Sequence, residues 1–211
     1  APRTDLMSEL VHAEIDGERL DDEHVLGFLR LLLPAGAETT FRAFGTLLTA
    51  VLTHPGALEQ LRADRSKIPA AVEETLRWQT SVNLAARMAT RDTEVAGTAI
   101  PAGSMVYALI TSANHDEACY EHPERWDLER PPAPHLAFGT GPHQCIGLHL
   151  ARLELRVGLE AVLDRLPDLQ LDPDEPPPRI AGYAFCGPDR IPVRFTPTRD
   201  GAGLRVSPTP G

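Results

Sequence analysis

The sequence predicts a mainly α fold with small β-sheets, an α+β arrangement. Apolar residues recur at helical spacing from Val25 to Leu52 and again from Leu148 to Leu166, so two long helices are expected. Between them, residues 93–110 form short β-prone runs separated by glycine and proline, which is typical of strands joined by tight turns. Two long helices with a small sheet region therefore define the expected fold class.

Composition limits the class of protein. The 211 residues are 42% hydrophobic, enough for a genuine core, and carry a formal net charge of −10. This charge repels phosphate backbones, so nucleic acid is not expected as a partner. No apolar run reaches the length that spans a membrane, and three widely spaced cysteines build no disulfide framework. We therefore expect a soluble, cytoplasmic protein without membrane contact.

The first long helix has clear start and stop signals. Acidic residues at 21–23 mark its beginning, and the His-Pro-Gly sequence at 54–56 marks its end. Pro34 lies in its middle and cannot donate a hydrogen bond to the carbonyl of Arg30, while Gly36 removes a side chain two residues later. The helix is therefore expected to kink and open near Pro34.

A shorter helix is expected to begin at Pro69 and to carry Glu74 and Arg77 on one face, because residues three apart are neighbours on a helix. In isolation, such a pair is usually an exposed ion pair that contributes little to stability. In the strand region that follows, Pro101 and Gly103 favour a tight turn before a strand at 105–110.

The C-terminal elements follow in order. The helix from Leu148 ends before Pro167, and the proline-rich residues 172–178 predict an extended connector. A strand is expected at 191–195. The Gly, Pro, Ser and Thr content of residues 197–211 predicts a disordered tail.

Residues 138–147 form a glycine-punctuated loop that delivers one cysteine, Cys145, just before the last long helix. Glycine permits positive φ and close backbone approach, so such a loop can wrap around a sulfur atom. The start of the following helix favours the thiolate form. A zinc site of His143, Cys145 and His149 is the competing interpretation, but structural zinc usually takes four ligands in paired spacings.

This loop resembles the haem-binding loop of the cytochrome P450 family. The match is carried in a single register by Phe138, Gly139, Gly141, His143, Cys145 and Gly147. The resemblance implies haem b as the cofactor and Cys145 as the axial ligand of its iron. A thiolate ligand on haem iron favours cleavage of the O–O bond of dioxygen, so it selects monooxygenase chemistry. Residues 1–196 would then form the C-terminal half of a P450 fold.

Ala35 and Gly36, followed by Glu38 and Thr39, resemble the oxygen-side motif of the same family. Small residues leave room between the helix and the porphyrin, and a threonine hydroxyl can pass protons from water. The resemblance therefore implies proton delivery by Thr39 and a supplying relay through Glu38. Taken alone, Glu and Thr in a helix are usually solvent-facing or bonded to a backbone carbonyl.

The resemblance implies three further sets of residues. Glu74 and Arg77 would join Arg125 of a His-Pro-Glu-Arg-Trp segment to fix the underside of the haem loop. Arg87 and His143 would pair with the haem propionates, since cationic or N–H donors suit a carboxylate. The residues expected to face the substrate are Val82, Asn83, Leu84 and Phe185.

The function implied is a haem-thiolate monooxygenase that hydroxylates or epoxidises a small organic substrate. Electrons would come from NAD(P)H through a ferredoxin-like or flavodoxin-like donor. Such an acidic donor could dock on the basic face of the last long helix, near His149, Arg152 and Arg156. A solvated helix face is the alternative for these three residues.

The resemblance covers only the C-terminal half of a family member, so the chain is expected to be either a fragment or a natural short homologue. A non-catalytic homologue that activates another enzyme is the alternative function. The presence of Cys145 together with Glu38 and Thr39 argues against it, because a scaffold gains nothing from these residues.

Overall fold

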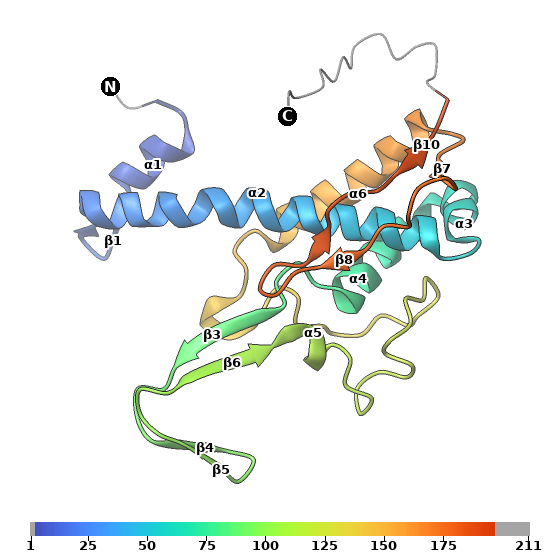
Figure 1. Cartoon of the computed structure of the whole chain (residues 1–211). Coiled ribbons are helices and arrows are strands. Elements are labelled where there is room, and N and C mark those ends of the chain that lie inside the picture. Colours follow the sequence, from blue (N-terminus) through green and yellow to red (C-terminus); the bar gives the residue numbers. More distant parts are fainter. Residues whose placement is uncertain (1–2, 197–211) are drawn as a thin grey trace. The chain divides into compact units, whose positions relative to one another are not determined.

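The computed structural model describes residues 3–196, and the chain divides between Thr39 and Thr40 into two compact units. The described elements are helices and short antiparallel strand pairs (Figure 1). The predicted mainly α fold with small sheets is therefore confirmed. The assignment of residues 1–196 to one partial domain stays a prediction, and the expected tail at 197–211 lies outside the described residues.

The first unit contains a short helix and a hairpin ahead of the long helix: α1 (Leu6–His12), β1 (Glu14–Ile15) and β2 (Glu18–Arg19). Asp5 caps α1, because its side chain accepts a hydrogen bond of 2.8 Å from the backbone N–H of Ser8. Asp16 and Gly17 turn the chain between β1 and β2 with φ angles of 54° and 82°. An Asp-Gly pair suits this tight turn because both central residues need positive φ.

Helix α2 (Asp22–Thr53) is the long helix expected from the sequence, and its ends agree with the predicted start and stop signals. The predicted opening at Pro34 is wrong, since the helix continues through Pro34 without interruption. A proline removes one backbone hydrogen bond, and the turns on either side keep theirs. The boundary between the two units falls within this helix.

The core of the second unit lies among the C-terminal part of α2 and three more helices, α3 (Ala57–Ala63), α4 (Ile68–Trp78) and α6 (Leu148–Arg165). A single 3-10 turn, η1 (Arg65–Lys67), joins α3 to α4. The most completely buried apolar side chains come from all four helices and include Leu47, Val51, Leu61, Ile68, Leu155 and Leu159. Burial of this kind contributes roughly 1.5–3 kcal/mol for each large side chain.

Helix α6 packs closely on the C-terminal part of α2 because Gly158 lacks a side chain. A Cβ atom at Gly158 would lie 2.7 Å from the ring of Phe44. This close approach holds the middle of α6, which carries the buried Leu155 and Leu159, against the core (Figure 1).

The strand region consists of two antiparallel pairs. β3 (Leu84–Met88) pairs with β6 (Met105–Leu109), and β4 (Thr93–Val95) pairs with β5 (Thr98–Ile100). The second pair is a hairpin that turns at Ala96 and Gly97, which adopt φ angles of 48° and 79°. Strand β3 was not expected from the sequence, which assigned Val82, Asn83 and Leu84 to a substrate-facing segment. A short helix, α5 (Ile110–Ala113), follows β6.

The C-terminal part of the described chain contributes two further strand pairs. β7 (Gln170–Leu171) pairs with β10 (Val193–Arg194), and β8 (Ile180–Ala181) pairs with β9 (Gly187–Pro188). β10 confirms the strand expected at 191–195. Among the helices described in residues 3–196, none has the length and apolarity needed to cross a lipid bilayer.

Candidate functional site

The Cys145 loop has the backbone conformation that its glycines predict. Gly139 and Gly141 adopt φ angles of 66° and 68°, which favour glycine. A 3-10 turn, η2 (Gly141–His143), brings the chain back, and the backbone N–H of Cys145 donates to the carbonyl of Phe138 at 2.8 Å. The Cys145 side chain is a free thiol and is exposed, and α6 begins three residues later. The loop therefore presents one sulfur atom at the start of a long, well-packed helix.

The ring of Phe138, at the start of this loop, contacts two polar groups. The guanidinium carbon of Arg152 lies 4.6 Å from the ring centroid, and the His135 imidazole centroid lies 6.1 Å from it. Both groups are held by Glu73 of α4. The Glu73 carboxylate accepts hydrogen bonds from Arg152 Nε at 2.6 Å and from Arg152 Nη2 at 2.8 Å, and it lies 3.2 Å from His135 Nε2.

These contacts determine the charge state of Glu73. Burial raises the pKa of the Glu73 carboxyl group, but the hydrogen bonds from Arg152 and His135 outweigh burial and lower the pKa to about 2. The hydrogen bond to Glu73 in turn raises the pKa of Arg152. Glu73 and Arg152 therefore form a charged pair across the whole physiological pH range.

The Glu73 pKa predicts a pH dependence of stability. The unfolded carboxyl titrates near 4.5 and the folded one near 2, so its stabilising contribution is complete above about pH 5 and is lost as the pH falls toward 2. Because the side chain is 42% exposed, we discount the contribution to about 1–2 kcal/mol. Urea unfolding at pH 6 and pH 3 should show that Glu73→Gln costs stability mainly at pH 6. An equal cost at both pH values would contradict the ion pair.

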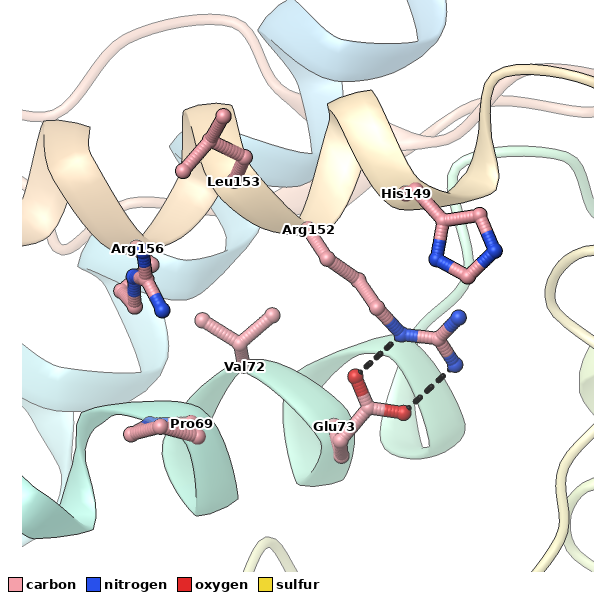
Figure 2. A pocket seen from close by; sticks show the side chains of 7 residues that line it. All are labelled: Pro69, Val72, Glu73, His149, Arg152, Leu153 and Arg156. Atoms are coloured by element: carbon pink, nitrogen blue, oxygen red, sulfur yellow. Dashed lines mark hydrogen bonds and ion pairs between the residues drawn. The ribbon is translucent and has the colours of Figure 1, made fainter.

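A groove of about 240 Å³ lies between α4 and α6 on this side of the second unit. Its lining residues are Pro69, Val72, Glu73, His149, Arg152, Leu153 and Arg156. Figure 2 shows Arg152 of α6 reaching across to Glu73 of α4, with His149 and Arg156 on either side. The three basic residues predicted to share a face of α6 thus line one groove, but Arg152 is engaged by Glu73.

Glu74 and Arg77, also on α4, form a buried ion pair with two parallel hydrogen bonds of 2.8 Å. The prediction that the Arg125 side chain joins this pair is wrong. Its side chain is 69% exposed and pairs with Glu124, whereas Arg130 donates from Nε to Glu74 at 3.0 Å. Arg125 contributes only its backbone carbonyl, which accepts a hydrogen bond from Arg77.

The reason for this exchange is the neighbouring tryptophan. Trp126 is buried and donates from Nε1 to the hydroxyl of Thr75 on α4 at 2.9 Å. The Arg125 side chain remains on the solvent side. The chain then returns toward Glu74 through Asp127, whose backbone N–H also donates to the Glu74 carboxylate at 3.0 Å, and this return brings Arg130 alongside.

Asn114 links this buried pair to the cysteine loop. Its backbone carbonyl accepts a hydrogen bond from Arg77 at 3.0 Å, and its side-chain oxygen accepts one from the backbone N–H of Leu136 at 2.8 Å. The carbonyl of Leu136 in turn accepts a hydrogen bond from Gly139 in the loop. Asn114 is fully buried, so it transmits the position of α4 to the segment that leads into Phe138.

The residues predicted to face a substrate come together from two distant segments. Val82 and Phe185 form an antiparallel bridge, and the backbone N–H of Asn83 donates to the carbonyl of Ala184 at 2.8 Å. Leu84 then begins β3, and Phe185 remains 47% exposed. Whether these side chains contact a substrate stays a prediction.

Arg87 and His143 lie on different elements of the second unit. Arg87 is on β3, where its Nη1 donates to the carbonyl of Ala86, and His143 ends η2. Both side chains are exposed. Their predicted pairing with haem propionates stays a prediction.

The oxygen-side residues belong to the first unit. The Thr39 hydroxyl donates to the backbone carbonyl of Ala35 at 2.7 Å, which is the bonding expected for a threonine inside a helix. A Cβ atom at Gly36 would meet no other described atom within 4 Å. The roles of Glu38 and Thr39 in proton delivery stay predictions.

Comparison with protein families decides the identity of the chain. Residues 63–188 match the family described as Cytochrome P450. The chain belongs to the cytochrome P450 family. The Cys145 loop and the Glu74–Arg77 pair both lie within the matched residues, so the P450 resemblance expected from the sequence is confirmed.

Individual P450 relatives support this assignment. A steroid C26-monooxygenase of Mycobacterium tuberculosis is 44% identical over 199 residues, which are 93% of this chain and 53% of that protein. The cytochrome P450 monooxygenase PikC of Streptomyces venezuelae is 41% identical over 210 residues, or 96% of this chain and 49% of that protein. The solved structure of the P450 CYP109Q5 from Chondromyces apiculatus matches with a TM-score of 0.87 and 42% identity, covering 93% of this chain and 51% of that one. The chain thus spans about half the length of these relatives.

Haem b is the cofactor of the P450 family, and the residues present fit it. Cys145 offers an exposed, free thiol on a loop whose glycines remove side chains around the sulfur. The Cys145 thiol is exposed, and so is the next side chain, Ile146 (88%), so this part of the loop is accessible to a large apolar ligand. A soft thiolate donor of this kind is a preferred ligand of haem iron.

Several functional residues of this P450 chain were missed from the sequence. Arg130 had a signal, since it is a second arginine shortly after Arg125, but the sequence does not say which one points inward. Glu73 and Asn114 had no such signal. Their partners lie 62 to 79 residues away for Glu73, and 22 to 37 residues away for Asn114.

Proposed function

We propose that this chain is part of a haem-thiolate monooxygenase that inserts one oxygen atom of O2 into a small organic substrate by hydroxylation or epoxidation. The observation that carries the proposal is the Cys145 loop, in which two glycines at positive φ and the Phe138 carbonyl hold one exposed cysteine at the start of α6. When bound there, haem supplies the activation of dioxygen, and a thiolate ligand favours O–O cleavage.

The side chains around Cys145 have separate tasks in this proposal. The Cys145 sulfur binds the haem iron, and the Phe138 ring limits the access of water to it. Arg87 and His143 donate hydrogen bonds to the haem carboxylates, for which exposed cationic or N–H donors are suited. The buried Glu74–Arg77 pair and Asn114 keep the loop in position from beneath.

Glu38 and Thr39 deliver protons to the reacting oxygen in this proposal. The Thr39 hydroxyl donates to Ala35, so its oxygen is still available to accept a hydrogen bond from water and to pass a proton on. Ala35 and Gly36 leave space beside it. Glu38 supplies protons to Thr39 from the solvent side.

Replacing Thr39 with alanine should therefore uncouple electron consumption from product formation. We expect electron consumption to continue while more hydrogen peroxide and less product form, by roughly 10- to 100-fold in product per electron. Thr39→Ser, which keeps the hydroxyl, is the matched control and should stay close to the parent. Unchanged coupling in Thr39→Ala would remove Thr39 from the proton path.

The substrate contacts and partners follow from the same proposal. Val82, Asn83, Leu84 and Phe185 border an apolar substrate, since their segments lie side by side and Phe185 is partly exposed. A ferredoxin-like or flavodoxin-like donor carries electrons from NAD(P)H. It docks near His149 and Arg156, because these two basic side chains line one groove and attract acidic groups on the surface of the donor. The protein works in the cytoplasm.

A reduced carbon monoxide difference spectrum tests the proposed function. The chain is loaded with haem, reduced and exposed to carbon monoxide, and we expect a Soret band at the position of thiolate-ligated haem. Haem uptake without that band, or no haem uptake, would overturn the proposal in favour of a non-catalytic role.

A further inference from the structure

Glu73 organises the polar groups that pack on Phe138. Its carboxylate accepts two hydrogen bonds from Arg152, whose guanidinium lies 4.6 Å from the Phe138 ring centroid. Figure 2 shows this pair spanning from α4 to α6. A bidentate carboxylate fixes the plane of a guanidinium group, which sets how it meets an aromatic ring.

His135 joins the same arrangement in one definite tautomer. The backbone N–H of Ala137 donates to His135 Nδ1 at 3.2 Å, so Nδ1 is an acceptor. Nε2 therefore carries the hydrogen that it donates to Glu73 at 3.2 Å. The His135 side chain is only 5% exposed, and its ring contacts Phe138. One carboxylate thus anchors both polar groups that touch the Phe138 ring.

Phe138 connects this arrangement to the cysteine. Its backbone carbonyl accepts the hydrogen bond from the Cys145 N–H at 2.8 Å, which closes the loop from 138 to 145. Movement of Phe138 therefore changes the hydrogen bond that closes the loop around Cys145.

We propose that Glu73 is a positioning residue that acts through Arg152 and His135 to hold Phe138, and thereby to fix the Cys145 loop. The part of this inference that concerns haem rests on the proposed function, because Cys145 is the iron ligand there. This role is exerted through Arg152 and His135 and requires no contact of the carboxylate with haem or substrate. Its loss releases Arg152 and His135, and the hydrogen bond between Phe138 and Cys145 then opens more often.

Amide hydrogen exchange of the haem-free chain tests the positioning role directly. We expect the Cys145 amide to exchange roughly tenfold faster in Glu73→Gln, which loses the charged acceptor but keeps the size of the side chain. The matched control is Glu160→Gln, which makes the same change of charge on α6 beside Arg156, 3.9 Å away, and does not contact Arg152. It should leave the loop unchanged.

A second variant separates positioning from general loss of stability. If Glu73→Gln also speeds exchange in the core helix around Leu47 and Val51, then Arg152→Lys decides, since lysine keeps the charge but loses the bidentate pair and the flat contact with Phe138. Faster exchange confined to residues 138–147 in either variant supports the proposal. Equal exchange in Arg152→Lys, Glu160→Gln and the parent overturns it.

The haem-loaded protein gives an independent readout that a purely structural role would not change. The reduction potential of the iron should shift in Glu73→Gln and not in Glu160→Gln, because loop geometry and hydrogen bonding at the sulfur tune the metal. If the chain binds no haem, the exchange result still decides the role of Glu73. If the chain binds haem but neither the amide exchange of the loop nor the reduction potential changes in Glu73→Gln, the positioning role of Glu73 is wrong and the proposed function is unaffected.

Discussion

Replacing Cys145 with alanine or histidine should abolish the thiolate-type Soret band of the carbon monoxide complex. Alanine removes the ligand, and histidine supplies a neutral nitrogen donor that gives a different electronic state of the iron. We expect complete loss of the thiolate band in both variants, with haem uptake falling steeply in Cys145→Ala. The measurement is the reduced difference spectrum at equal protein concentration.

The other two cysteines provide the controls for this experiment. Cys119 is exposed and far along the chain from the loop, so Cys119→Ala should keep the thiolate band. Cys186 is buried, its thiol donates to the carbonyl of Gly182 at 3.1 Å, and burial raises its pKa. It is a poor source of thiolate. A thiolate band that persists in Cys145→Ala would contradict the assignment of Cys145.

The second large effect concerns Arg77, which uses all five of its N–H groups. Two donate to Glu74, and the others donate to the backbone carbonyls of Asn114, Pro123 and Arg125 at 2.9 to 3.0 Å. The side chain is 2% exposed. Arg77→Met should therefore cost about 3–5 kcal/mol in the free energy of unfolding, because it deprives the buried Glu74 carboxylate of its main partner and leaves the carbonyls of Asn114 and Pro123 unsatisfied, whereas that of Arg125 keeps its bond from Arg130.

Urea unfolding followed by circular dichroism measures this cost. Arg77→Lys should recover little of it, since an ammonium group has three donors and no planar fork. Arg125→Met should stay within about 0.5 kcal/mol of the parent, because only its backbone takes part. The loss of stability in Arg130→Met should fall between those of Arg77→Met and Arg125→Met. A larger loss for Arg125→Met than for Arg130→Met would reverse the correction made by the structure.

Features with local causes were predictable from the sequence. The ends of α2 follow from acidic residues and a His-Pro-Gly stop, and the Cys145 loop follows from glycine spacing within ten residues. The Glu74–Arg77 pair follows from helical geometry alone. In each case the residues that determine the structure are neighbours in sequence, so short-range rules are sufficient.

Features that depend on packing between distant segments were not predictable in this way. The choice of Arg130 over Arg125 depends on how Trp126 packs on α4, 51 residues before it. Glu73 is next to Glu74 in sequence, yet its role depends on His135 and Arg152, which only the folded chain brings near. The continuity of α2 at Pro34 was missed for another reason, since a long helix tolerates one missing hydrogen bond.

The contacts of Arg77 have a consequence for how much residues 114–130 can vary. Arg77 binds this irregular segment through three main-chain carbonyls, which every amino acid possesses. The hydrogen bonds that fix the path of the segment therefore depend little on its exposed side chains, among them Cys119, Glu121 and Glu124. A saturation library at these three positions should retain the fold almost without restriction, whereas Trp126 and Arg130 should accept few replacements. Substitutions at the surface of this segment should therefore leave the geometry of the cysteine loop that it supports unchanged.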